Sequence, residues 1–589
     1  MCGIAGLLLP KGHVPDEDVL VKLQESLAHR GPDDADHKIM DHVALVHTRL
    51  SIIDVAGGHQ PLEKGQDLSL VMNGEIYNYV ELHAKYASYP FTTRSDSETA
   101  LPVYEDVGAR EMTGHLRGMF ALCLIDRKKD LAILARDPYG IKPLYYVALE
   151  GGGIAFASEI APLVRAGLAQ SIVNPHARAQ SLQLGFGVGD ATAVGFVKRV
   201  LPGETLVIED GRITARYQQD LPAFAPRVRG EDVLQKELEE VLRGSVRVHL
   251  RSDVPYGLFL SGGLDSATLL KLMSEESGTR VRTYSIGFTG TNVHDEREQA
   301  RLMAGHFNSD HHELDFTQDD FWKTLPLVAK ACDDLMFDQA MLPTYKLAAF
   351  AAQDLKVVLS GEGGDEMFAG YRRYQKVRLP WFLGGGKNRT KGFVDRLKVG
   401  SYHLEDWRDA YGALEKDLKG QGMSKLDLAQ RLDQMTWLPN DLLVKLDRCL
   451  MAHGLEGRTP FLDPEVGAFC ASLPEKARVQ GRYGKWIVRA WLAKNLPESA
   501  PFAKKRGFRV PVSQWIASKG HRLGTLVSRQ EGVAEIMDKR DVQFLFAQND
   551  DRALFAAWEL LFFALWHEIH IKGKDVVPDT LAMLSRGAI

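Results

Sequence analysis

The chain has 589 residues, of which 45% are apolar and 25% charged, and its formal net charge is −5. At roughly 150 residues per domain this length predicts about two to four domains with full cores, and the balanced charge excludes a general nucleic-acid or membrane-surface binder. The five cysteines are scattered without a CxxC pair, which excludes a disulfide framework or a cysteine zinc site and favours a cytoplasmic location. The first residues also lack the basic segment of a secretory signal.

The first 220 residues alternate short apolar runs with turn residues. Apolar runs over 43–54, 68–78 and 119–137 are typical of antiparallel hairpins, and a last hairpin is expected to turn at Asp210–Gly211. Helical spacing occurs over 19–27. These features predict a β-rich α+β domain over residues 1–220.

The pattern changes after a proline-containing basic segment at 220–230, which we interpret as a linker. Predicted strands over 254–260, 281–288 and 354–360 alternate with loops and helices, which indicates a parallel sheet covered on both faces. The chain beyond about residue 370 is expected to be mostly helical, and the apolar stretch 553–566 is too short to span a bilayer and predicts a buried helix. The second domain is therefore placed at 221–589.

Cys2 follows the initiator methionine. If Met1 is removed, Cys2 carries both a thiol and an α-amine that can act as a base near neutral pH. The alternative is that Cys2 is an ordinary second residue. Polar clusters between the apolar runs favour catalysis, because they supply oxyanion donors at Asn73 and Gly74 and, for an amino-acid substrate, a cation at Arg49. Glu75 or Asp96 could take the ammonium group of such a substrate.

Six segments of this region resemble one family when they are taken together. They are MCGIAG (1–6), HRGPDD (29–34), RLSIID (49–54), HQPL (59–62), NGEIYN (73–78) and SDSE (95–98). The combination resembles the glutaminase domain of the N-terminal-nucleophile (class II) glutamine amidotransferases. The resemblance implies an αββα sandwich, with Cys2 as the nucleophile. It also implies a glutamine pocket and oxyanion hole formed by Arg49, Asn73, Gly74, Glu75 and Asp96.

Two glycine-rich loops follow predicted buried strands in the second domain. SGGLDS (261–266) can gather backbone N–H groups around an anion at a helix start, and it is not a Walker A loop. SGEGGDE (360–366) also ends a strand, so both loops are expected to face one crevice, where Asp265 and Asp365 could share Mg²⁺ on polyphosphate oxygens. The alternative is that both carboxylates cap turns. Lys445 could offset phosphate charge or could lie on a helix surface.

These loops, together with SIGF (285–288), LPTY (342–345), FAGY (368–371), PFLD (460–463) and KKRGFRVP (504–511), resemble the ATP-pyrophosphatase domain of glutamine-dependent asparagine synthetases of the bacterial type. The resemblance implies an α/β domain with a parallel sheet and helical tail. It implies Mg²⁺ on Asp265 and Asp365, Glu362 as a proton acceptor and Lys445 on the phosphates. The implied ATP-binding residues are Leu260, Ser261, Gly262, Gly263, Asp265, Ser266, Ile286, Gly287, Ser360, Gly361 and Glu362.

The family resemblance implies synthesis of asparagine from aspartate, ATP and ammonia released from glutamine, in a protein that could be a homodimer and that binds neither nucleic acid nor membrane. One departure is Gly457, where the family pattern has an apolar residue. Arg30 and Met119 are placed by the family near the domain interface; they could line an ammonia path, or be a paired arginine and a core methionine. The main alternative is a related amidotransferase that amidates a peptide, a sugar acid or a secondary metabolite. A catalytically silent protein on this fold is disfavoured, because the motif residues are intact.

Overall fold

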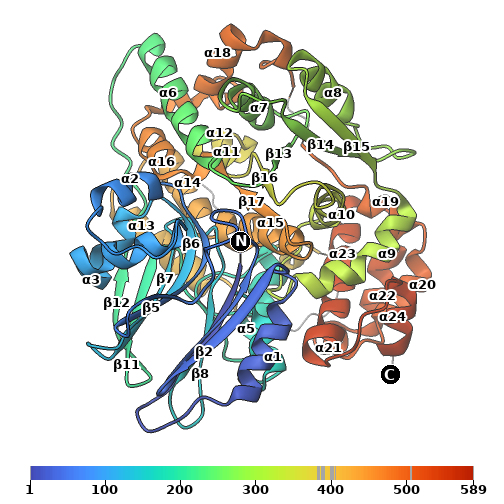
Figure 1. Ribbon diagram of the computed structural model, residues 1–589. Helices are drawn as coiled ribbons and strands as arrows, with labels where there is room; N and C mark the ends of the chain where they lie inside the picture. The colour runs from blue at the N-terminus through green and yellow to red at the C-terminus, as the bar shows by residue number, and fades with distance from the viewer. Residues whose placement is uncertain are drawn as a thin grey trace.

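A computed structural model describes residues 2–380, 382, 385, 392–397, 404, 406–504 and 507–587 (Figure 1). The strands of the first 220 residues gather in one part of the molecule. The helices of the C-terminal tail, red in Figure 1, gather at the opposite side, near the C-terminus. In Figure 1 the parallel sheet lies between the helices α7 (Leu264–Glu276) and α8 (Arg297–His306) and the N-terminal strands.

The N-terminal region contains two six-stranded sheets whose strand pairs are antiparallel. Ile4 and Leu8 point between the sheets, whereas Ala5 and Leu7 face the helices outside the first sheet, as alternation along a strand requires. The first sheet has the order β10 (Lys198–Arg199), β8 (Tyr145–Ala148), β9 (Ile154–Ala157), β1 (Cys2–Leu8), β3 (Val43–Arg49), β2 (Asp34–Met40). The second has the order β12 (Arg212–Gln218), β11 (Glu204–Glu209), β7 (Leu131–Arg136), β6 (Gly118–Asp126), β5 (Leu68–Ile76), β4 (Leu62–Lys64).

Helices cover the outer face of each sheet, so the predicted αββα sandwich is confirmed. The predicted helix over 19–27 is α1, which is capped by the Asp16 side chain, and the hairpin between β11 and β12 turns at Asp210 and Gly211, both with positive φ. The helices on the first sheet are α1 (Glu17–Leu27), α4 (Ile160–Arg165) and α5 (Pro175–Leu184); those on the second are α2 (Tyr79–Lys85) and α3 (Ala100–His115).

The C-terminal region contains the predicted parallel sheet, which has five strands in the order β15-β14-β13-β16-β17. The strand order reverses at β13 and β16, and such a switch point opens a crevice at the carboxyl ends of the two strands. The strands are β13 (Tyr256–Phe259), β14 (Arg282–Gly287), β15 (Asp310–Asp315), β16 (Val357–Leu359) and β17 (Glu456–Arg458). Sequence analysis did not predict β17, which lies within the stretch expected to be mostly helical.

Helices surround this sheet and form the tail. They are α6 (Glu231–His249), α7 (Leu264–Glu276), α8 (Arg297–His306), α9 (Gln318–Ala331), α10 (Met341–Ala351), α11 (Gly364–Met367), α12 (Arg372–Val377), α13 (Asp409–Gly420), α14 (Lys425–Met435), α15 (Leu443–Met451), α16 (Pro464–Ala471), α17 (Glu475–Arg478), α18 (Trp486–Asn495), α19 (Val512–Ala517), α20 (Gly520–Val527), α21 (Glu531–Ala534), α22 (Lys539–Ala547), α23 (Asp551–Trp566) and α24 (Thr580–Gly587). A short hairpin, β18 (Val479–Gln480) and β19 (Tyr483–Gly484), precedes α18.

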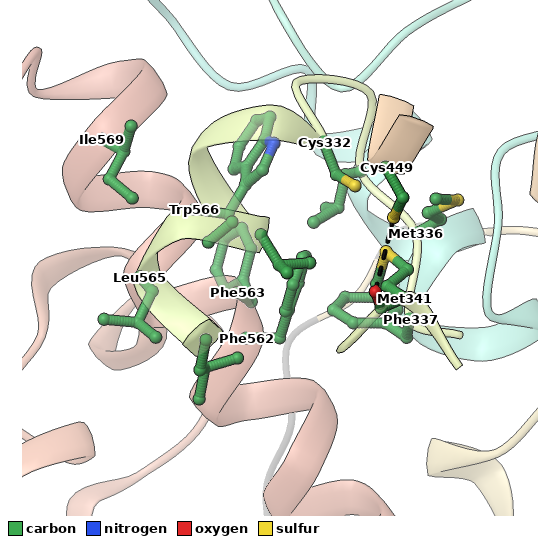
Figure 2. Close-up of a cluster of buried hydrophobic side chains, with 14 of the residues drawn as sticks. Cys332, Met336, Phe337, Met341, Cys449, Phe562, Phe563, Leu565, Trp566 and Ile569 are labelled. Carbon is green, nitrogen blue, oxygen red and sulfur yellow. Dashed lines mark hydrogen bonds between the residues drawn. The ribbon is translucent and has the colours of Figure 1, made fainter. Parts of the chain in front are cut away.

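The apolar stretch near the C-terminus forms α23, and its burial confirms the predicted core helix. The prediction that this stretch is too short to span a bilayer was wrong, because with the following π-helix it runs from Asp551 to Ile571 and by length and composition alone could cross a membrane. However, 89% of its apolar window is buried inside the protein. Figure 2 shows how its aromatic side chains pack around the segment after α9, and Trp566 donates a hydrogen bond to the Asp333 carbonyl (3.1 Å). Helix α23 therefore packs against the segment between α9 and α10, which contains Asp338.

Candidate active sites

Cys2 is the first residue of β1 and pairs with Arg49 of β3. Its side chain is buried, and its main-chain nitrogen donates to Asn73 Oδ1 (3.0 Å). Burial raises the pKa of the Cys2 thiol. Because burial disfavours the thiolate, attack by this sulfur requires a nearby base.

Asn73 and Gly74 lie on β5 beside Cys2. The Asn73 side chain is fully buried, and its Nδ2 has no hydrogen-bond partner in the part of the chain that the structure describes. A Cβ on Gly74 would lie 2.0 Å from the Met119 carbonyl oxygen, so only glycine fits there. An unpaired buried donor is costly unless a ligand uses it, and this one is suited to a developing oxyanion.

Arg49, Glu75 and Asp96 complete the predicted glutamine pocket. The carbonyls of residues 53–55 hold the Arg49 guanidinium at 2.7–3.2 Å. Asp96 accepts a hydrogen bond from the Ile76 N–H (2.7 Å), and burial raises the pKa of Asp96 to about 6. Burial, and then repulsion from Asp96, raise the pKa of Glu75 well above its usual value.

Strand β17 of the C-terminal sheet reaches Glu75 of the predicted pocket. This contact was not predicted from the sequence. Arg458 Nη2 lies 3.3 Å from Glu75 Oε1, and Arg458 Nε donates to Glu456 (2.6 Å). Between them, Gly457 faces α15, where a Cβ would lie 3.0 Å from the Leu450 side chain. The departure at Gly457 therefore concerns the packing of β17 on α15.

A buried ion-pair network joins Cys2 to the C-terminal region. Arg30 is fully buried; it donates to the Cys2 carbonyl (3.1 Å), to Glu159 (2.7 Å) and, in a fork, to Asp447 (2.8 and 3.1 Å). Met119 is also fully buried and belongs to a core cluster. These contacts are those of a paired arginine and a core methionine, and the ammonia path stays a hypothesis.

The two glycine-rich loops meet because they follow neighbouring strands, β13 and β16. The Ser266 hydroxyl closes the first loop on the Ser261 carbonyl (3.0 Å). A Cβ on Gly361 would lie 2.9 Å from the Asp265 Cβ, and one on Gly364 would lie 2.7 Å from Asp265 Oδ1. The glycines therefore permit the close approach of the second loop to Asp265.

Asp265 and Asp365 are brought together at this contact. Lys485, which sequence analysis missed, places its Nζ 2.6 Å from Asp265 Oδ1 and 2.7 Å from Asp365 Oδ1. A cation therefore fits between the two carboxylates, and such oxygens suit Mg²⁺. Within the described ranges no group of three or more His, Cys, Asp or Glu side chains could hold a metal ion, so further ligands would have to come from phosphate or water.

Glu362 and Lys445 form a second pair at the same crevice. Lys445 Nζ lies 3.0 Å from Glu362 Oε1 and 2.9 Å from Asp338 Oδ2. Burial alone would lower the pKa of Lys445, but the two carboxylates outweigh it and raise the pKa well above its usual value. Lys445 is buried rather than on a helix surface. No pattern in the sequence singled out Asp338.

Two adjoining cavities open at the loops. The first, about 290 Å³, is lined on one side by the β14 residues 284–286 and on the other by the loop 360–362. The second, about 390 Å³, is lined by residues 261–265 and by the cations Lys485, Arg489 and Lys504. Of the predicted ATP-binding residues, Leu260, Ser261, Asp265, Ser266, Ile286, Ser360, Gly361 and Glu362 line the first and Gly262 and Gly263 the second.

The roles of all these residues remain predictions, and two parts of the predicted site lie outside the two cavities or outside the described residues. Gly287 lines neither of these two cavities, and a Cβ there would meet Arg297 Nε at 2.1 Å. Lys505 and Arg506 of the KKRGFRVP segment lie outside the described residues.

Comparisons with known proteins cover both regions. A family model described as a glutamine amidotransferase domain matches residues 1–218, and one described as asparagine synthase matches residues 237–568. Asparagine synthetase (glutamine-hydrolyzing) 1 of Bacillus subtilis is 31% identical over 99% of this chain and 99% of its own. Asparagine synthetase B (glutamine-hydrolyzing) of Escherichia coli is 29% identical over 90% and 86%, and Amidase chry2 of Gibberella zeae is 27% identical over 92% and 93%. The chain therefore belongs to the asparagine synthase family.

Proposed function

We propose that the chain makes asparagine from aspartate, using ATP and ammonia released from glutamine. The observation that carries the proposal is the pairing of two distinct sites. One is a buried cysteine beside the unpaired amide nitrogen of Asn73, and the other is a crevice between the two glycine-rich loops. The family relationship supports both assignments.

At the N-terminal site the Cys2 sulfur attacks the side-chain amide carbonyl of glutamine. The thiol proton passes to the α-amine that removal of Met1 creates, and then to the departing ammonia. Asn73 Nδ2 and the Gly74 N–H stabilise the oxyanion. Water then cleaves the thioester, which releases glutamate and restores the thiol. Arg49 binds the substrate carboxylate, and Asp96 with Glu75 binds its ammonium group.

At the C-terminal site a carboxylate oxygen of aspartate attacks the α-phosphorus of ATP, and pyrophosphate leaves. Mg²⁺ held between Asp265 and Asp365 would neutralise phosphate charge. Ammonia then forms a bond to the activated carbonyl carbon, the bond to AMP breaks, and Glu362 accepts the proton that ammonia loses. Lys445, which contacts Glu362, offsets negative charge as AMP leaves. Ile286 of β14 offers an apolar surface for the adenine, and the basic cavity suits pyrophosphate.

A second candidate is the amidation of a carboxylate other than aspartate. The similarity to a protein named an amidase favours keeping it, because the loops and the nucleophile serve either acceptor. The cytoplasmic location expected from the cysteine pattern, and the Mg²⁺ and the homodimer expected from the family resemblance, are also parts of the proposal.

The test is pyrophosphate release with ATP, Mg²⁺ and ammonium, with aspartate compared against a panel of other carboxylic acids and the products identified by mass. Asparagine and AMP formed with aspartate alone support the proposal. Turnover of another acid, with none of aspartate, would move the chain to the second candidate.

A further inference from the structure

Lys485 inserts one ammonium group between the two loops that the proposed function assigns to the phosphates of ATP. Its Nζ lies 2.6 Å from Asp265 Oδ1 and 2.7 Å from Asp365 Oδ1, and the residue is only 3% exposed. The lysine belongs to neither loop, because it lies 220 residues after Asp265, between β19 and α18. A third segment of the chain therefore meets both loops at one atom.

The backbone around Lys485 positions its side chain between the two loops. Lys485 has a φ of 55°, a conformation that non-glycine residues rarely adopt. Its N–H donates to the Phe368 carbonyl (3.0 Å), just after the second loop. A Cβ on Gly370 would lie 2.3 Å from Lys485 Cε, so the lysine stem passes over a glycine. Residues in uncommon backbone conformations concentrate at functional sites.

The contact has a consequence for ligand binding. Two carboxylates that share one nitrogen at these distances would repel each other strongly without a cation between them. A divalent ion on the nucleotide needs the same oxygens, so it competes with the ammonium for them. Lys485 could bind phosphate oxygens instead, because the cavity that it lines with Arg489 and Lys504 is basic and suits phosphate.

We propose that Lys485 is an internal counter-ion that holds the two loops together before nucleotide binds, and that it exchanges its carboxylate contacts for phosphate oxygens when ATP and its metal ion arrive. The inference rests on the proposed function insofar as it takes ATP and Mg²⁺ as the ligands of these loops. It does not depend on which acid is amidated.

The test measures metal binding without nucleotide, with Mn²⁺ as a paramagnetic probe whose free fraction is followed by electron paramagnetic resonance. Lys485→Met should bind Mn²⁺ about tenfold more tightly than wild type, because the competing cation is gone. The matched control is Lys494→Met, which removes a charge from an exposed position of α18, the helix that directly follows Lys485, and it should leave the Mn²⁺ affinity unchanged. Lys485→Gln provides a second neutral variant if the methionine variant does not fold.

The second half of the test is the binding of ATP with Mg²⁺ present, measured by calorimetry. Here Lys485→Met should bind about tenfold more weakly than wild type, and Lys485→Arg should recover part of the loss. Unchanged or weaker Mn²⁺ affinity in folded neutral variants would overturn the proposal, even if the wild type makes asparagine. Tighter Mn²⁺ and weaker ATP binding would uphold it, even if aspartate proved the wrong acceptor. A wild-type protein that binds no metal–ATP would overturn both.

Discussion

The two candidate sites handle buried charge in different ways. At the N-terminal site, burial raises the pKa values of Glu75 and Asp96, which favours their uncharged forms, and Arg458 lies against Glu75. At the C-terminal crevice, Asp265, Asp365 and Glu362 instead lie against the lysines Lys485 and Lys445.

This difference follows from the ligands of the proposed function. Glutamine brings a neutral amide to the Cys2 side, and neutral donors, the unpaired Asn73 Nδ2 and the Gly74 N–H, can meet the oxyanion that develops there. ATP brings several negative charges, so its site needs cations, and these must be neutralised internally when no nucleotide is bound. In this account, ligand binding at the second site is an exchange of ion pairs, whereas at the first site the Asn73 Nδ2 donor is already unpaired.

Among the variants that keep the Cys2 nucleophile, the largest expected effect is that of Glu362→Gln. The amide keeps the size of the side chain but cannot accept a proton, so amide formation should fall about 10²- to 10⁴-fold with either ammonia or glutamine as the nitrogen source. Glutamine hydrolysis, followed by glutamate release, should stay near the wild-type rate. An equal fall in both activities would contradict the separation of the sites.

Asp447→Asn tests the buried ion-pair contact between the N-terminal and C-terminal regions. It leaves Arg30 buried with only one of its two carboxylate partners, and breaking such a buried pair costs about 3–5 kcal/mol of unfolding free energy. The control is Glu465→Gln, which removes an exposed partner of Arg117 from an ion pair between the same two regions and should cost less than about 1 kcal/mol. Thermal melts compare the two, and equal shifts would show that the buried network adds nothing special.

Asn73→Ala removes the unpaired donor. The rate of glutamine hydrolysis should fall about 10²- to 10³-fold, with little change in KM, because the contact forms fully only in the transition state. Ammonia-dependent synthesis serves as the internal control and should be unchanged. A loss confined to KM would argue for substrate binding instead of oxyanion stabilisation.

The smallest expected effect is a pH dependence set by Asp96. Its pKa of about 6 means that the carboxylate is charged above pH 6 and protonated below it. Binding of the glutamine ammonium group should therefore weaken as pH falls, and KM for glutamine should rise about tenfold by pH 5. Asp96→Asn should show a high KM that varies little with pH. A flat wild-type profile from pH 7 to 5 would remove Asp96 from this role.

Much of the fold was predictable, because both regions have clear periodicity. The alternation of β1 and the turn at Asp210–Gly211 come from local rules, and the meeting of the two loops follows from strands that end in polar residues. Strand β17 could not be predicted, because its sequence, Glu-Gly-Arg, lacks the apolar run that marks β16, and its pairing partner β16 lies far away in the sequence.

The groups that were missed share one property. Lys485, Asp338 and Arg458 lie outside the two glycine-rich loops and outside the N-terminal motifs, and each reaches its site only through long-range packing. For Arg458 the physical cause is a contact between regions, which no local pattern encodes. The residues found from sequence, such as Cys2 and Asp265, lie in motifs whose chemistry is local.

The most direct test of the two-site account is the Cys2→Ala variant assayed with two nitrogen sources. The account predicts that glutamine-driven asparagine formation and glutamine hydrolysis both disappear, because the thioester cannot form, while ammonium-driven formation stays near the wild-type rate. Loss of both activities in a folded variant, or persistence of the glutamine-driven activity, would contradict it.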